Sequence, residues 1–245
     1  MRRIRACWRL LRVFLHILAG LWIAAVRLPR LQPAGQSAQV QVWSLALLGH
    51  IGIALEVRGQ PPLLGPVLLV ANHISWLDIP VMHAARHCRF VSKSDIRDWP
   101  LVGTLATAAG TLYIERRSRR DAMRVVHLMR DALLAGEVLA VFPEGTTGDG
   151  LSVLPFHANL LQAALSADAP AQPVGLRFID KASGQPSLAP SYVGDDTLLG
   201  SIWRTLCAPP MVAVVHYGAP EQAAGRDRRA WSEQLRGKVE GLRRG

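Results

Sequence analysis

A histidine and an aspartate five residues apart are the strongest candidates for chemistry in this chain. His73 and Asp78 occur in the segment 72–78, NHISWLD. An imidazole titrates near neutral pH, and a carboxylate beside it orients the ring and raises its basicity, so the pair could remove a proton from an alcohol. Five residues on a continuous helix are about 140° apart. The two side chains can therefore meet only if residues 73–78 form a bend that leads into a helix.

A non-catalytic alternative is ordinary, because a histidine often opens a helix beside a capping aspartate. The position of His73 favours chemistry. It follows the apolar run 67–71, VLLVA, which is typical of a buried strand. In open α/β sheets, ligands bind at the carboxyl ends of the strands.

Two other polar segments also follow predicted strands. The segment 110–116, GTLYIER, ends on Arg116, whose guanidinium could hold a phosphate or a carboxylate. The segment 141–147, VFPEGTT, runs into a tight loop in which Glu144 stands between a proline and a glycine. Glu144 could bind hydroxyl or ammonium groups. A plain surface arginine and a strand-ending turn are the alternatives for the two segments.

Several other kinds of site are disfavoured. His83 and His87 are four residues apart on a predicted helix, but with Asp78 they make a poor metal set, and we expect no metal. The sequence contains no Gly-x-Ser-x-Gly elbow of a serine hydrolase, no Gly-x4-Gly-Lys phosphate loop and no dinucleotide fingerprint.

The elements that must position these residues alternate from residue 56 onward, which predicts an α/β domain with a mainly central sheet flanked by helices. Expected strands cover 56–59, 67–71, 88–92, 111–115, 138–142, 173–179 and 211–217. Expected helices cover 77–86, 100–109, 119–136, 157–167, 197–206 and 227–243.

Positive charge is concentrated at the N-terminus. The 245 residues carry 28 Lys and Arg against 18 Asp and Glu, a net charge of +10. Residues 1–30 hold seven arginines and no acid, so the other 215 residues carry 21 basic and 18 acidic groups, only +3. A basic segment rich in aliphatic residues favours anionic lipid over nucleic acid as the partner. The three cysteines form no disulfide or zinc pattern, which is typical of a reducing compartment.

Two apolar segments, 13–26 and 42–55, are separated by a linker, 29–41, that contains proline and glycine. Fourteen helical residues reach about 21 Å, less than the roughly 30 Å hydrocarbon core. We therefore expect an interfacial or half-inserted hairpin that anchors residues 1–55, followed by a catalytic domain over 56–245. A single span over 10–28, a signal peptide and two core helices of a soluble domain are the alternatives.

The three polar segments, in this order, resemble the glycerolipid acyltransferase family typified by 1-acyl-sn-glycerol-3-phosphate acyltransferase, also called lysophosphatidic acid acyltransferase. The resemblance covers roughly residues 56–220. The matching blocks are Asn-His-x4-Asp at Asn72, His73 and Asp78, Gly-x3-Ile-x-Arg at Gly110, Ile114 and Arg116, Phe-Pro-Glu-Gly-Thr at 142–146, and a looser Val-Pro-Val-like block at 172–174.

The resemblance implies an enzyme that moves a fatty acyl chain from acyl-CoA or an acyl carrier protein thioester to the free hydroxyl of a lysolipid. It implies no cofactor, and it places the enzyme at the cytoplasmic face of a bacterial inner membrane, monotopic or single-pass. His73 would be the general base and Asp78 its orienting carboxylate. The residues implied in acceptor binding are Arg116, Phe142, Pro143, Glu144, Gly145 and Thr146.

The identity of the acceptor stays open. The resemblance points first to 1-acyl-glycerol-3-phosphate, which gives phosphatidic acid in phospholipid biosynthesis. Many family members carry an arginine suited to phosphate after the Glu-Gly-Thr step, whereas residues 146–150 here read TTGDG. That run, with KSD at 93–95, also resembles the branch that acylates lyso-ornithine lipid. A non-enzymatic membrane-binding protein and a soluble hydrolase are the alternatives from other classes.

Overall fold

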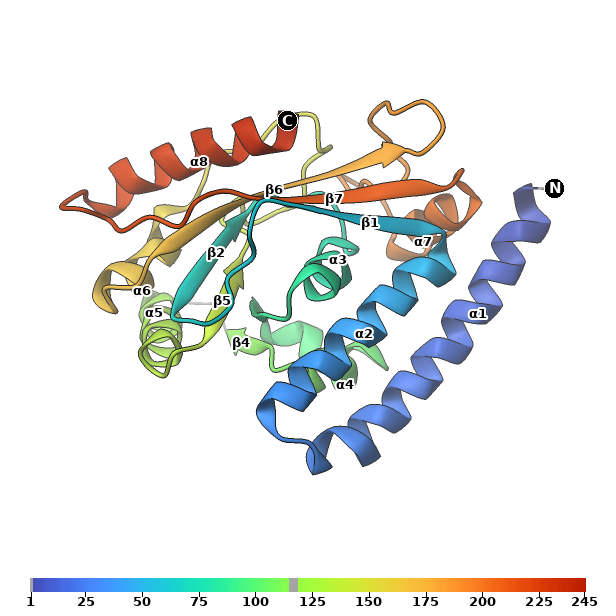
Figure 1. The fold of residues 1–245 in the computed structure, drawn as a ribbon, viewed down its shortest axis with the longest axis horizontal. Coiled ribbons are helices and arrows are strands. Elements are labelled where there is room, and N and C mark those ends of the chain that lie inside the picture. The colour runs from blue at the N-terminus through green and yellow to red at the C-terminus, as the bar shows by residue number, and fades with distance from the viewer. Residues whose placement is uncertain (1, 115–118) are drawn as a thin grey trace.

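A central β-sheet organises the chain (Figure 1). The computed structural model describes residues 2–114 and 119–245. In this part of the chain the sheet has seven strands in the order β1-β7-β6-β2-β5-β3-β4, parallel except for the antiparallel pair β6 and β7. The strands are β1 (Ile53–Arg58), β2 (Val67–Ala71), β3 (Arg89–Lys93), β4 (Leu112–Ile114), β5 (Val138–Val141), β6 (Ala171–Asp180) and β7 (Met211–Tyr217). The expected α/β class with a central sheet is confirmed.

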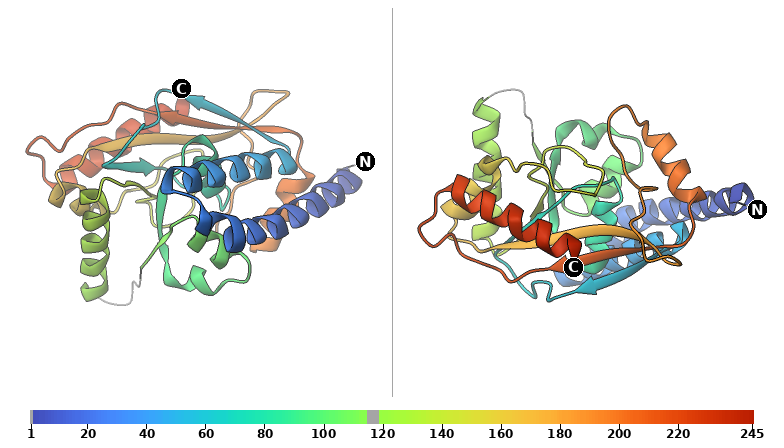
Figure 2. Two further views of the ribbon diagram at one scale, coloured as in Figure 1. Left: turned by 60° about the horizontal axis from the view of Figure 1, so that its bottom comes forward. Right: turned by 90° about the horizontal axis from the view of Figure 1, so that it is seen from above.

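Helices cover both faces of this sheet (Figures 1 and 2). One face packs on α2 (Pro33–Ile51) and α3 (Asp78–Ala85), and the other on α5 (Arg119–Leu134), α6 (Leu161–Ser166) and α8 (Arg228–Arg244). All five side chains of β2 are buried between these layers. This explains its continuous apolar sequence, VLLVA, which is typical of parallel strands covered on both faces. The other helices are α1 (Arg2–Trp22), α4 (Val102–Ala108) and α7 (Leu198–Cys207), and the short turns are η1 (Ile23–Arg27), η2 (Leu28–Arg30), η3 (Ser94–Asp98) and η4 (Ala158–Leu160).

The N-terminal segment differs from the sequence expectation. Helical structure runs without interruption from Arg2 to Arg30, through α1, η1 and η2, rather than over 13–26 alone. The expected linker 29–41 is wrong, because α2 already begins at Pro33. Proline is well placed at the first helical position, where its missing N–H has no partner to lose. The second helix ends at Ile51, and β1 begins at Ile53, three residues before the expected strand.

One buried arginine joins the N-terminal helix to the sheet domain. Arg9 is 7% exposed, and its Nη1 donates to the main-chain oxygens of Leu206 and Ala208, 2.9 Å each, at the end of α7. A cation suits a helix carboxyl terminus, where carbonyl groups lack helical partners. A Cβ at Gly52 would lie 2.1 Å from Arg9 Nη2, so the turn from α2 into β1 also closes around this guanidinium. Arg9 therefore fixes α1 to both α7 and the α2–β1 turn.

The contact between α8 and β6 depends on a glycine. A Cβ at Gly175 would lie 2.5 Å from the backbone nitrogen of Arg243. We expect Gly175→Ala to lower the free energy of unfolding by about 1–3 kcal/mol, because α8 must move away from the strand. The matched control is Gly237→Ala within α8, where a Cβ meets nothing within 4 Å, and a gain of about 0.5–1 kcal/mol is expected. Urea unfolding in detergent measures both, and equal effects of the two substitutions would contradict the proposed contact.

Candidate active site

The structure brings His73 and Asp78 into contact at the carboxyl end of β2. His73 follows the strand by two residues, Asp78 is the first residue of α3, and the bend between them is the one that their spacing required. His73 Nδ1 lies 2.7 Å from Asp78 Oδ2. The Asp78 side chain is fully buried, while that of His73 is 20% exposed. Buried Asp78 thus holds one side of the imidazole, and the other side is accessible to solvent.

The same carboxylate oxygen also fixes the backbone of the bend. Asp78 Oδ2 accepts hydrogen bonds from the N–H groups of Ile74, at 2.6 Å, and Ser75, at 2.8 Å. Both donors belong to loop residues that precede Asp78, so these hydrogen bonds tie the loop to the buried carboxylate. One oxygen therefore sets both the loop conformation and the orientation of the His73 ring.

Asn72 continues the sheet beyond the end of β2. The last β2–β6 backbone pair is Ala71 with Val174. The Asn72 amide then donates to the Leu176 carbonyl at 3.0 Å and accepts from the Leu176 N–H at 2.7 Å. A side-chain amide carries the same donor and acceptor as a peptide group, so Asn72 replaces the next ladder step while the chain turns away. This residue positions the start of the loop that carries His73.

Glu144 holds the His73 backbone from the β5 side. Its Oε1 accepts the His73 N–H at 2.8 Å, and its Oε2 accepts the Leu154 N–H at 3.1 Å. Glu144 is 4% exposed, and this burial raises its pKa to about 7, opposed by the two backbone hydrogen bonds and by His73. The Gly148 N–H also donates to the His73 carbonyl at 2.8 Å. The proposed contact of Glu144 with an acceptor stays a prediction, since both of its oxygens already accept backbone N–H groups.

An aromatic ring covers the His73 imidazole. The rings of His73 and Phe142 are stacked with centroids 4.1 Å apart and planes 6° apart. Phe90, on β3, stacks behind Phe142 at 5.5 Å. Offset or parallel ring contacts of this kind stabilise one ring orientation. Phe142 therefore limits rotation of the His73 ring, whose Nδ1 is already held by Asp78.

The other residues predicted for acceptor binding lie in the loop that follows Phe142. The Pro143 carbonyl accepts the His157 N–H at 2.8 Å. Gly145 has φ +71°, a conformation that favours glycine, and a Cβ there would press on the His157 ring at 3.0 Å. Thr146 is exposed. Arg116 lies outside the described residues, and its role stays a prediction.

Some features of the site were not expected from the sequence. Phe90 supports Phe142, and Lys93 is exposed at the carboxyl end of β3, on the same sheet edge as His73. The strand pattern could have indicated both, because carboxyl ends of parallel strands share an edge. His83 and His87 stack at 5.3 Å inside the α3 region. In the described part of the chain no three His, Cys, Asp or Glu side chains are grouped to hold a metal.

A partly exposed imidazole held by a buried carboxylate at the carboxyl edge of a sheet is an arrangement that suits an α/β enzyme, and the role of His73 as a base stays a prediction. The profile of the Acyltransferase family matches residues 54–177. The lyso-ornithine lipid O-acyltransferase of Pseudomonas aeruginosa is 35% identical over 96% of this chain and 92% of that protein. The chain therefore belongs to the acyltransferase family, and it is an acyltransferase.

One further relative supports this assignment, and one solved structure shares the fold. The 1-acyl-sn-glycerol-3-phosphate acyltransferase of Neisseria gonorrhoeae is 35% identical over 83% of this chain and 80% of that protein. The crystal structure of the 1-acyl-sn-glycerophosphate acyltransferase from Thermotoga maritima superposes with a TM-score of 0.66 at 20% identity, covering 100% of this chain and 96% of that one. At this identity the superposition establishes the fold.

The raised pKa of Glu144 predicts a pH-dependent stability. The pKa is about 7 in the folded protein against 4.5 as the ordinary value, so the folded state loses stability as pH rises from about 4.5 through 7. Glu144→Gln lacks this dependence. We expect the free energy of unfolding of the wild type to fall by on the order of 3 kcal/mol relative to Glu144→Gln between pH 4.5 and 8, from 1.36 kcal/mol per pKa unit. Urea unfolding across this range measures it, and parallel pH profiles for the two proteins would contradict it.

Proposed function

We propose that this acyltransferase moves a fatty acyl chain from an acyl thioester to the free hydroxyl of a lysolipid. The observation that carries the proposal is the contact of His73 with buried Asp78, on a loop held by Glu144 and covered by Phe142. This arrangement presents one ring nitrogen to a substrate and fixes the other. It suits removal of a hydroxyl proton.

The reaction follows from this geometry. With its proton on Nδ1, facing Asp78, His73 has a lone pair on Nε2 that accepts the proton of the lysolipid hydroxyl. The hydroxyl oxygen forms a bond to the thioester carbonyl carbon, and the carbon–sulfur bond then breaks. The imidazolium, stabilised by Asp78, returns the proton to the departing thiolate. The acceptor is itself the nucleophile, so the mechanism needs no covalent enzyme intermediate.

Two acceptors fit the proposal. The first is 1-acyl-glycerol-3-phosphate, with phosphatidic acid as the product, as named for the Neisseria relative. The second is lyso-ornithine lipid, as named for the Pseudomonas relative. The second is favoured by Thr147, which stands after the Glu-Gly-Thr step and donates its hydroxyl to the Tyr192 carbonyl, so this position offers no cation for a phosphate.

The N-terminal helix supports placement on a membrane surface. Arg2–Arg30 is long and apolar enough to cross a membrane by length and composition. The contacts of α1 favour a helix that lies along the membrane instead, because Ala6 and Arg9 are buried against the sheet domain. The opposite side of α1 is exposed and apolar, with the residues Ile4, Trp8, Leu11, Leu15, Leu18 and Trp22 at alternating spacings of four and three.

This exposed stripe matches an interfacial helix. Apolar side chains enter the acyl region, tryptophans occupy the head-group level, and the flanking arginines meet anionic lipids. We propose that the stripe lies in the cytoplasmic leaflet of a bacterial inner membrane. This leaflet faces the cytoplasm, where thioester donors are made. The lysolipid then reaches His73 from the bilayer.

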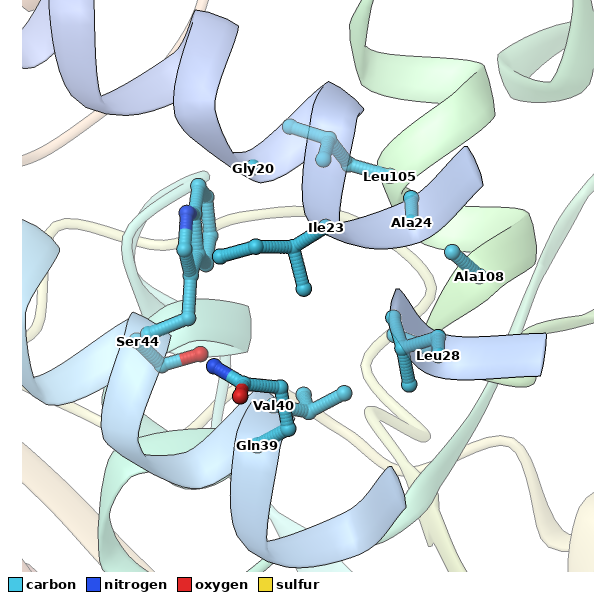
Figure 3. Close-up of a pocket in the computed structure, with 11 residues that line it drawn as sticks. Gly20, Ile23, Ala24, Leu28, Gln39, Val40, Ser44, Leu105 and Ala108 are labelled. Atoms are coloured by element: carbon cyan, nitrogen blue, oxygen red, sulfur yellow. The ribbon is translucent and has the colours of Figure 1, made fainter. Parts of the chain in front are cut away.

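A small apolar cavity marks the seam between this helix pair and α4. Gly20, Ile23, Ala24 and Leu28 line it from one side, and Val40, Leu105 and Ala108 from the others (Figure 3). Its volume of about 50 Å³ accommodates a few water-sized molecules, far less than a fatty acyl chain. The fatty acyl chain is therefore not assigned to this cavity.

The function is tested with each lysolipid separately. Purified protein in detergent receives one acyl thioester and either 1-acyl-glycerol-3-phosphate or lyso-ornithine lipid, and mass spectrometry identifies the acylated product. We expect His73→Ala and Asp78→Asn to lower the rate by about 10²–10⁴-fold, the usual contribution of a general base. His127→Ala, an exposed histidine on α5, is the matched control and should retain the rate. Full acyl transfer by His73→Ala would refute the proposal.

Glutamate substitutions on α1 test whether the exposed stripe contacts the membrane. Trp8 and Trp22 are each 60% exposed on α1. We expect Trp8→Glu with Trp22→Glu to weaken binding to vesicles containing phosphatidylglycerol by more than 10-fold, because burial of each aromatic side chain contributes about 1.5–3 kcal/mol. Leu134→Glu, 64% exposed on α5 at the other side of the molecule, is the control (Figure 1). Equal vesicle flotation of the two variants would exclude the stripe as the contact.

A further inference from the structure

A second cavity lies directly behind the loop that carries His73. Its volume is about 250 Å³, and Ile74, the neighbour of His73, forms part of its wall. The remaining walls are the 149–151 loop, the segment of β6 that extends beyond β2, the 184–188 turn and the end of α8. The cavity therefore adjoins the candidate active site without including the His73 ring.

Arginine side chains dominate the polar lining. Arg177, Arg243 and Arg244 face the cavity, with Asp149 as the acidic residue of the lining. Arg243 and Arg244 share one carboxylate, Glu240, at 2.6 Å and 2.7 Å. The Arg177 guanidinium donates to the oxygens of residues 243–245, and Glu56 is the acid that acts on its charge. Two arginines thus share Glu240, whereas Arg177 forms no ion pair with an acidic side chain in the described part of the chain.

Burial and mutual repulsion among cations lower the pKa of Arg177. Burial lowers its pKa, and the neighbouring guanidinium groups of Arg58 and Arg243 lower it further, against the opposite effect of Glu56. Positive groups held close together are stabilised by an anion that contacts them. Apolar groups of Phe178, Ile179 and Leu188 line the rest of the cavity. The cavity suits an anionic group attached to a less polar chain.

The position of the cavity indicates which substrate brings that anion. α8 covers the face of the sheet opposite α2, so its end lies away from the exposed stripe of α1 (Figures 1 and 2). With the stripe in the membrane as proposed above, a lipid acceptor approaches from the stripe, which leaves the other side to a water-soluble donor. Thioester donors of both kinds, coenzyme A and acyl carrier protein, carry the acyl group on a phosphopantetheine arm. The phosphate of that arm is separated from the thioester, as the cavity is separated from the His73 ring.

We propose that this cavity binds the phosphate of the donor's phosphopantetheine arm, with Arg177, Arg243 and Arg244 as the cationic groups. The proposal rests on the thioester donor of the proposed function. Arg243 also donates to the main-chain oxygens of Gly150 and Leu151, at 2.9 Å and 2.6 Å, so it ties the cavity wall to α8. Arg244, with a side chain 71% exposed, is the residue to vary without disturbing the fold.

The test measures binding, which does not require acyl transfer. Free coenzyme A, pantetheine without phosphate, and holo and apo acyl carrier protein are titrated calorimetrically into the detergent-solubilised protein. We expect Arg244→Ala to weaken binding of coenzyme A or holo carrier protein about 5–10-fold, as for loss of one charge-assisted hydrogen bond, and to leave pantetheine binding unchanged. Asp149→Asn removes the acidic wall and should strengthen phosphate-dependent binding.

The matched control is Arg228→Ala, which makes the same charge change at the other end of α8. We expect less than about a 2-fold effect, because exposed charges beyond a Debye length are screened. An effect of Arg244→Ala on coenzyme A alone, or on holo carrier protein alone, supports the proposal and identifies the donor. Equal effects of Arg244→Ala and Arg228→Ala, or an effect of Arg244→Ala on lysolipid binding instead, would overturn it. Calorimetry measures binding without acyl transfer. Failure of the acyl transfer assay and failure of this proposal can therefore be told apart.

Discussion

The arrangement of the site depends on one carboxylate oxygen. Asp78 Oδ2 contacts the His73 ring and accepts the N–H groups of Ile74 and Ser75, all within 2.8 Å. The other oxygen, Oδ1, is buried without a hydrogen-bond partner among the described residues, so the stabilisation of this carboxylate rests on Oδ2. Opening the bend would remove these partners from a fully buried side chain, which is costly. The orientation of the imidazole is therefore a consequence of loop closure, rather than of a side-chain preference.

The rest of the sheet edge is built to keep this loop in place. Asn72 extends the β2–β6 ladder, Glu144 accepts the His73 N–H, and Gly148 donates to the His73 carbonyl. These contacts come from β6 and from the loop after β5, the two strands that flank β2. These hydrogen bonds tie the loop after β2 to β6 and to the loop after β5. The His73 ring is therefore positioned before any substrate arrives.

The sequence was sufficient for the sheet but not for all of the site. Apolar runs and glycine stops predicted most strands and helices within a few residues, and the spacing of His73 and Asp78 required the bend that is observed. The role of Glu144 could not be read, because its partners are backbone N–H groups, one of them 71 positions away, and backbone donors leave no residue-type signal. The predicted N-terminal helix began too late and was too short. The arginines between residues 2 and 12 interrupt the apolar pattern, and the buried side of the helix is set by its contact with α7, which the local sequence does not indicate.

The contact of Arg9 with Leu206 also orders events during synthesis. The two residues are 197 positions apart, so α1 leaves the ribosome long before α7 exists to receive it. Its apolar stripe and its one docking arginine are both uncovered in that interval. On the proposed membrane contact, lipid would cover the stripe during that interval and protect the nascent chain from aggregation. Docking of α1 on α7 would then be a late step that brings the finished domain to the bilayer.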